Sequence, residues 1–244
     1  SGETQTTAFA IAPDSIGWWS ERLSRLGVDL IETGERFADP FIAFEDPDGM
    51  RLELGASVSH SDLPQDDGSA LPPLHAIRGF HSVTLAVAAV DATAALLRDT
   101  MGFVERESEG SRLRLTATSG PTTPARAIDL LSTPDAPPSK LGAGSVHHIA
   151  FRMADEADQV RWHAALSEHG VKSTRIVDRH YFRSLYFREP GGVIFEFATD
   201  LPGFAIDEPV DQLGHDLMLP AWLESRRDSI VAALPKVTLP AVKP

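Results

Sequence analysis

Two stretches, SVHHIAFRM (145–153) and REPGGVIFEFATD (188–200), decide the fold of this chain of 244 residues. Both are rich in β-branched and aromatic residues, as strands are, and the second begins with a Pro-Gly-Gly turn. A helix (154–169) that ends at Gly170 and a further strand (183–190) are predicted between them. The segment from about 144 to 200 is therefore expected to form one β-α-β-β-β module.

The same layout occurs twice more, from about 4 to 55 and from about 79 to 132. The three helix ends read LGV, MGF and HGV, and FEDPDGMRLEL (44–54) matches FREPGGVIFEF (187–197) in register. Glu53 and Glu196 therefore take equivalent positions, and Asp129 takes that position in the middle module. Repetition at a fixed period is the signature of a repeated structural unit. The sequence predicts three modules of one kind.

These repeats predict an α+β fold, in which mixed sheets are cupped around a site and helices lie outside. Neither of the glycine-rich nucleotide-binding motifs occurs, so a parallel nucleotide-binding sheet has no support. Residues 1–58 are expected to be a single module, the remnant of an N-terminal domain, and 59–77 a linker rich in Ser, Pro and Asp. Residues 78–200 would form a two-module domain, and 201–244 a tail with one helix over 220–235.

Composition excludes several classes of protein. There are 22 Lys and Arg against 35 Asp and Glu, a net charge of −13 that disfavours nucleic acids and anionic membranes as partners. No apolar run approaches the roughly 18 residues of a membrane span, and the first residues lack the pattern of a signal peptide, so a cytoplasmic protein is expected. Because there is no cysteine, a metal would have to be held by histidines and carboxylates.

Strand alternation singles out a His and a carboxylate. His148 and Arg152 share one face of their strand, and Glu196 is expected on the corresponding face of the last strand. This pair suits a divalent metal, although two partly exposed polar residues would give the same pattern. Alternation directs His147 to the opposite face. Arg179 and Tyr186 lie in IVDRHYFRSLYFREP (176–190), which is either an ordinary exposed strand pair or a wall that binds an anionic or phenolic substrate.

HHIAFRM, REPGGVIFE and the repeated modules resemble the vicinal oxygen chelate superfamily, which includes glyoxalase I, fosfomycin and bleomycin resistance proteins and extradiol dioxygenases. RSLYFREPGGVIFEFATDLPGFAIDEP (183–209) and the helical segment after it resemble the bacterial hydroquinone-type ring-cleaving dioxygenases, and the likeness covers essentially the whole chain. The resemblance implies an Fe(II) or Mn(II) site with His148 and Glu196 as ligands, a small aromatic substrate and O2. It implies an acid/base role for His147 and substrate contacts for Tyr186 and Arg179, and Arg152 is a further candidate contact.

The chain departs from the family pattern of four modules, the first of which supplies a further metal histidine. At the position of His148 the other two modules carry Thr6 and Ser82, so the chain resembles a member that lacks the first module and has two of three ligands. The face with His148 is expected to be covered by a second chain, in a homodimer, or by the tail, or else to be locally disordered, and two ligands are expected to hold no tightly bound iron. Two alternatives remain: a metal lyase or isomerase of the glyoxalase I type, and a metal-free ligand-binding or resistance protein.

Overall fold

The computed structural model describes residues 1–56, 71–117, 127–142 and 144–236. The strands are β1 (Glu3–Ile11), β2 (Leu30–Arg36), β3 (Asp39–Glu45), β4 (Arg51–Ala56), β5 (Phe80–Val87), β6 (Phe103–Glu109), β7 (Arg112–Ala117), β8 (Ala127–Ser132), β9 (Ile149–Met153), β10 (Val177–Asp178), β11 (Arg183–Arg188) and β12 (Ile194–Thr199). The α-helices are α1 (Ile16–Arg25), α2 (Val90–Ala95), α3 (Glu156–Glu168) and α4 (Arg227–Ala233), and a π-helical turn (Leu96–Thr100) extends α2.

The third module shows how local sequence sets these elements. The carboxylate of Asp155 accepts a hydrogen bond from the backbone N–H of Asp158 and so caps the start of α3. Gly170, just after α3, has a φ of 73°, a left-handed conformation that glycine adopts without a steric penalty. The strand predicted over 145–153 is shorter than expected, since β9 begins only at Ile149. The segment STRIVDR (173–179) contributes only the two-residue strand β10.

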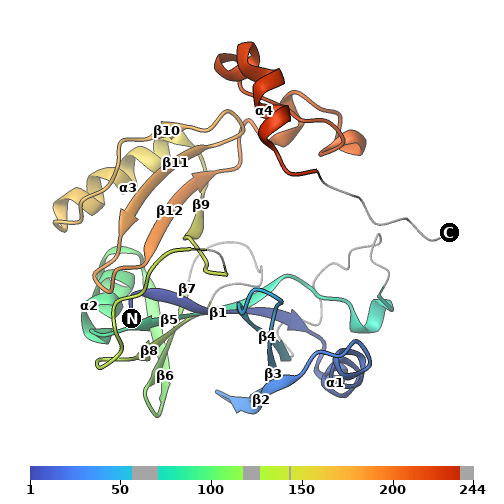
Figure 1. The fold of residues 1–244 in the computed structure, drawn as a ribbon. Coiled ribbons are helices and arrows are strands. Elements are labelled where there is room, and N and C mark those ends of the chain that lie inside the picture. Colours follow the sequence, from blue (N-terminus) through green and yellow to red (C-terminus); the bar gives the residue numbers. More distant parts are fainter. Residues whose placement is uncertain (57–70, 118–126, 143, 237–244) are drawn as a thin grey trace.

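The three modules form two sheets (Figure 1). The first two modules share one eight-stranded sheet, in the order β2-β3-β4-β1-β5-β8-β7-β6, because β1 and β5 pair antiparallel. The third module forms a four-stranded sheet, β10-β11-β12-β9. Both sheets are mixed, and the predicted α+β class with repeated modules is confirmed. The domain division at residues 58 and 78 stays a prediction, and most of the expected linker lies outside the described residues.

One apolar core joins the second and third modules. It contains Leu85 and Leu130 of the large sheet together with Leu185 and Phe195 of the small one. A helix covers the apolar face of the small sheet (Figure 1): the Trp162 ring of α3 lies edge-on to that of Phe197, with centroids 5.3 Å apart. Because alternate strand residues face opposite sides, this packing directs the side chain of Glu196 to the other face.

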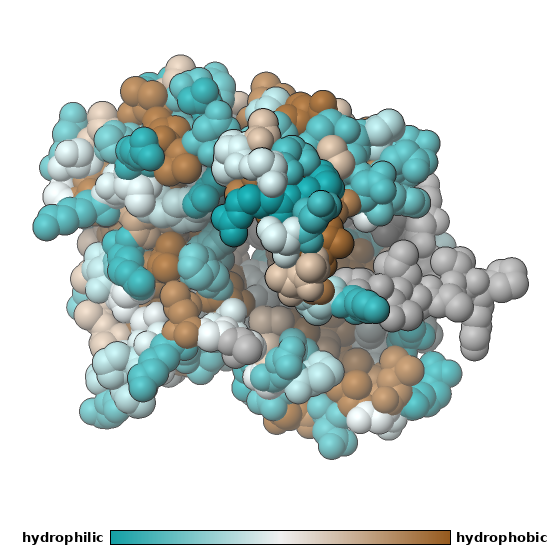
Figure 2. Space-filling view, turned by 45° about the horizontal axis from the view of Figure 1, so that its top comes forward, coloured by the Kyte–Doolittle hydropathy of each residue, from teal (hydrophilic) through white to brown (hydrophobic). Residues whose placement is uncertain are grey.

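The tail contributes little to either core. No residue from 200 to 236 is buried, and apolar side chains such as Val210 and Trp222 are 75% and 69% exposed. The helix predicted over 220–235 is a 3-10 segment (Ala221–Arg226) followed by α4. On the face shown in Figure 2, small patches of hydrophobic residues are surrounded by larger areas of hydrophilic residues. Within the described residues, no helix has the length and apolar character needed to cross a membrane.

Candidate metal centre

The small sheet places Glu196 at the middle of its polar face. In the strand register, Glu196 of β12 lies between Ala150 of β9 and Tyr186 of β11. His148 comes two residues before Ala150, so alternation puts it on the same face, beside Glu196. Ile194 also lies on this face. We call these five residues the third-module face.

His148 and Glu196 meet directly. His148 Nε2 lies 2.7 Å from Glu196 Oε2. The carboxylate is buried, at 3% exposure for the residue, whereas the imidazole is about one-third exposed. Ser184 Oγ donates a hydrogen bond to the other carboxylate oxygen, Oε1. His148 Nε2 and Glu196 Oε2, the two atoms that could bind a metal, therefore lie side by side on the polar face of the sheet.

This donor set fits part of a metal site. An imidazole nitrogen and a carboxylate oxygen are ligands for a divalent first-row metal. Ser184 on Glu196 Oε1, and His147 Nδ1 at 2.9 Å from His148 Nδ1, are contacts of the kind that orient metal ligands. His148 and Glu196 would supply two of the three protein ligands in a metal site that is built from two histidines and one carboxylate. Among the described residues, no third His, Asp or Glu joins them.

Two more predicted residues lie next to this pair. The Tyr186 ring is nearly perpendicular to the His148 ring, with centroids 5.8 Å apart. The Arg179 guanidinium carbon lies 5.3 Å from the centre of the Tyr186 ring, within reach of a cation–π contact. The structure therefore brings together His148, Glu196, Tyr186 and Arg179, so a guanidinium and a phenol lie beside the two candidate metal ligands.

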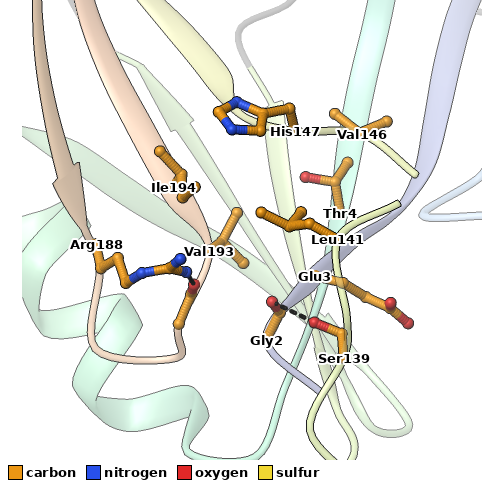
Figure 3. A pocket seen from close by; sticks show the side chains of 11 residues that line it. Gly2, Glu3, Thr4, Ser139, Leu141, Val146, His147, Arg188, Val193 and Ile194 are labelled. Atoms are coloured by element: carbon orange, nitrogen blue, oxygen red, sulfur yellow. Dashed lines mark hydrogen bonds between the residues drawn. The ribbon is translucent and has the colours of Figure 1, made fainter. Parts of the chain in front are cut away.

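The prediction that His147 faces away from His148 is wrong. The two rings are in edge contact, with centroids 5.2 Å apart, and one Nδ1 must donate to the other. The physical reason is that β9 begins only at Ile149: His148, directly before the strand, still follows its alternation, whereas His147, two residues before it, does not. His147 also lines a small cavity of about 190 Å³, with Val146, Thr4 and Ile194 among its walls (Figure 3).

Arg152 lies further along β9, away from the pair. Its Nε is 3.0 Å from Asp200 Oδ1, and both side chains are more than 60% exposed. The structure therefore shows an exposed ion pair here, and a role for Arg152 in substrate binding stays a prediction.

Sequence reasoning missed a contact that holds the turn carrying Arg179. Asp207 of the tail accepts a hydrogen bond from Tyr181 Oη at 3.0 Å, and His180 Nε2 lies 3.3 Å from the same oxygen. His180 has a φ of 73°, rare for a non-glycine residue. The ring of Phe204 stacks on Tyr181. We call Tyr181, His180, Asp207 and Phe204 the tail clasp. The only sign of it in the sequence is the large number of aromatic residues in 180–187.

The polar face of the large sheet repeats the arrangement without its histidine. Ala8 lies opposite Glu53, and Thr84 opposite Asp129, as Ala150 lies opposite Glu196. Counting back two residues gives Thr6 and Ser82 at the position of His148, as the sequence predicted. Here arginines engage the carboxylates: Arg36 Nη1 is 2.5 Å from Glu53 Oε2, and Arg114 binds Asp129 through two hydrogen bonds.

His81 is a buried residue that the sequence reasoning passed over. It is 7% exposed, and its Nε2 lies 3.4 Å from Asp39 Oδ2. The signal was present, because His81 precedes Ser82 as His147 precedes His148. The second module therefore carries the first histidine of the pair and has Ser82 in place of the second.

Comparisons with known proteins agree with this arrangement. The model of the Glyoxalase/Bleomycin resistance protein/Dioxygenase superfamily matches residues 79–197. A Bacillus subtilis (strain 168) protein named "Putative ring-cleaving dioxygenase MhqA" is 38% identical over 226 residues, which make up 91% of this chain and 71% of that protein. The chlorohydroquinone/hydroquinone 1,2-dioxygenase of Sphingobium indicum is 30% identical over 242 residues, 96% of this chain and 73% of that protein.

A solved structure extends the likeness to the whole fold. The crystal structure of a Bacillus subtilis protein described as a "putative dioxygenase" superposes with a TM-score of 0.89 at 34% identity, and the match covers 97% of this chain and 74% of that one. Dioxygenases of this superfamily generally use a non-haem metal. The fold, the three modules and these relatives together show that the chain belongs to the Glyoxalase/Bleomycin resistance protein/Dioxygenase superfamily.

Proposed function

We propose that the chain acts as a ring-cleaving dioxygenase on a hydroquinone- or catechol-like aromatic, with O2 and a non-haem Fe(II) or Mn(II) ion. The observation that carries the proposal is the 2.7 Å approach of His148 Nε2 to Glu196 Oε2, with Tyr186 and Arg179 alongside. A cytoplasmic location is part of the proposal, since the chain has no cysteine with which to form the disulfides that are common in secreted proteins.

His148 and Glu196 would hold the metal, and the metal would supply the redox chemistry that lets O2 react with the ring. Burial of Glu196 and its hydrogen bond from Ser184 fix the carboxylate in one orientation. The ligands would thus be set before a substrate arrives, which is the usual requirement of a tuned metal site.

The other residues would act on the substrate. Arg179 and Tyr186 lie where they could bind a ring hydroxyl: the guanidinium would favour the phenolate form and stabilise negative charge that develops on oxygen. His147 would accept a proton from the hydroxyl or return one, because its ring contacts His148 and borders the cavity of Figure 3.

Oxygen uptake tests this function. The chain would be loaded with Fe(II) or Mn(II) without air and then mixed with aerated hydroquinone, a substituted hydroquinone or catechol. We expect one O2 consumed per ring opened, loss of uptake in His148→Ala and Glu196→Ala, and normal uptake in the exposed-surface control His169→Ala. Metal-loaded protein that consumes no O2 with any of these diols would contradict the proposal, and oxygen-independent turnover of a thiohemiacetal would instead identify a glyoxalase I-type enzyme.

A further inference from the structure

Two arginines occupy the same position in the first and third modules. Each comes directly before a two-residue turn: Arg36 pairs with Asp39 beyond its turn, and the backbone N–H of Arg179 donates to the carbonyl of Phe182. The strand register gives the same match when it is followed from the carboxylate to the arginine, through Glu53–Ala43 and Phe41–Gly34 in one module and through Glu196–Tyr186 and Ser184–Val177 in the other. The two arginines are therefore equivalent, as the two carboxylates are.

In the first module this arginine neutralises the carboxylate. Arg36 Nη1 lies 2.5 Å from Glu53 Oε2, and the two side chains are 12% and 4% exposed. Because the strand order is β2-β3-β4, the arginine side chain must cross β3 to reach Glu53. It does so over the ring of Phe41, whose centre lies 3.9 Å from the guanidinium carbon, and the next residue on that face is the small Ala43. The ion pair is closed.

In the third module the equivalent arginine does not reach the carboxylate. The strand order β10-β11-β12 sets the same crossing, but the guanidinium carbon of Arg179 lies over the ring of Tyr186. No ion pair joins Arg179 to Glu196, although the structure describes both residues. Ser184 takes the position of Phe41 and donates a hydrogen bond to Glu196. The aromatic ring has thus moved two residues along the middle strand, to a position directly beside the carboxylate, and a neutral donor has replaced the cation.

The turn after Arg179 is anchored on the side away from Glu196. Tyr181 in this turn donates its hydrogen bond to Asp207, as part of the tail clasp. The equivalent turn of the first module instead contacts the second module, where the Arg114 guanidinium carbon lies 4.3 Å from the centre of the Phe37 ring. The clasp holds the backbone next to Arg179, so the side chain beneath the guanidinium decides how far the arginine reaches.

We propose that Tyr186 is a positioning residue that keeps Arg179 and Glu196 apart, and so holds open an ion pair that the first module closes. The separation leaves the negative charge of Glu196 for a metal cation and the positive charge of Arg179 for an anionic oxygen of the substrate. This use of the two charges rests on the proposed function, whereas the separation itself does not.

Removal of the ring tests the separation. In a crystal structure of Tyr186→Ala we expect the Arg179 guanidinium to donate to Glu196 at about 2.7–2.9 Å, the usual distance for such a pair. If the new pair is formed nine-tenths of the time, the apparent affinity for Mn(II) falls by about tenfold, because the pair and the metal compete for one carboxylate. Tyr186→Phe keeps the ring and should bind Mn(II) as the unchanged protein does. Tyr186→Val, which suits a strand, removes the ring by a second route and should behave as Tyr186→Ala does.

A double variant separates the effect of the arginine from that of the truncation. Tyr186→Ala with Arg179→Gln has the same missing ring but no cation, so it should bind Mn(II) as tightly as Arg179→Gln alone. The proposal would be overturned by an Arg179 that stays away from Glu196 in the structures of the ringless variants, or by a loss of affinity that Arg179→Gln does not relieve. If the unchanged chain binds no Mn(II), that result counts against the proposed function alone, and the crystal structures still decide the separation.

Discussion

Arg114 donates two hydrogen bonds to Asp129, Nε to Oδ1 at 2.7 Å and Nη2 to Oδ2 at 2.9 Å, at the module position that Glu196 holds in the third module. The two side chains are 9% and 1% exposed. The same carboxylate position therefore has two uses in one chain. In the large sheet an arginine balances its charge, and on the third-module face a histidine and a serine contact it instead.

Removal of Arg114 should destabilise the protein strongly. Arg114→Ala leaves the buried Asp129 with only the more distant Arg112, whose Nη1 lies 3.7 Å from Oδ2, and should cost up to about 3–5 kcal/mol of the free energy of unfolding. Denaturant unfolding measures the loss. The control is Arg152→Ala, which breaks an exposed ion pair of the same type and should cost less than about 1 kcal/mol. Similar losses for the two variants would show that Asp129 finds another partner.

The affinity for a metal should depend on the contacts that hold Glu196 in place. We expect Glu196→Ala and His148→Ala to abolish Mn(II) binding. Ser184→Ala should weaken it by about 10–100-fold, because the carboxylate loses the hydrogen bond that orients it. His147→Ala also removes a contact to a ligand, so at saturating metal it should leave metal content near normal and reduce turnover. Competition with a metal-binding dye measures the affinities. The control is His215→Ala, in the exposed tail, which should bind metal as the unchanged protein does. Weaker metal binding by this control would identify His215 as a ligand.

Glu189 should be a large contributor to stability at the junction of the second and third modules. Its buried carboxylate accepts hydrogen bonds from Thr93 Oγ1 of α2 at 2.5 Å and from the backbone N–H groups of Gly191 and Val193, both at 2.7 Å. Glu189→Ala leaves these donors unpaired and should cost at least about 2 kcal/mol in denaturant unfolding. Glu168→Ala, on the exposed end of α3, should change stability by less than about 0.5 kcal/mol. A loss no larger than that of the control would mean that water replaces the carboxylate.

The sequence was sufficient to predict the features that repeat from module to module. The matching turns of 44–54 and 187–197 placed Glu53 and Glu196 at one position, and the register of both sheets agrees. Strand alternation also placed His148 beside Glu196, because one face of β12 must pack on α3. These predictions depend on local period and on similarity between segments, which a single sequence contains.

Features that depend on long-range contacts could not be predicted in this way. The edge-to-edge pairing of β1 with β5 has no local signal in the sequence, since either strand could have paired elsewhere. The contact of Asp207 with Tyr181 spans 26 residues and has no repeat to reveal it. His147 was misplaced because alternation was applied two residues before the strand begins. In each case the deciding interaction is tertiary, and no local pattern specifies it.

Tyr181 should titrate at an unusually high pH. Its burial and the hydrogen bond that it donates to Asp207 raise the pKa of its phenol above the usual value of about 10. Because the folded-state pKa is the higher one, this contact stabilises the tail clasp at every pH below about 10, and its contribution is lost as the pH rises through the raised pKa. The chain has two tyrosines, so Tyr186→Phe leaves Tyr181 as the only one, and tyrosinate absorbance then reports its titration. Adding Asp207→Asn should lower the midpoint towards about 10, and an unchanged midpoint would show that Asp207 does not hold Tyr181.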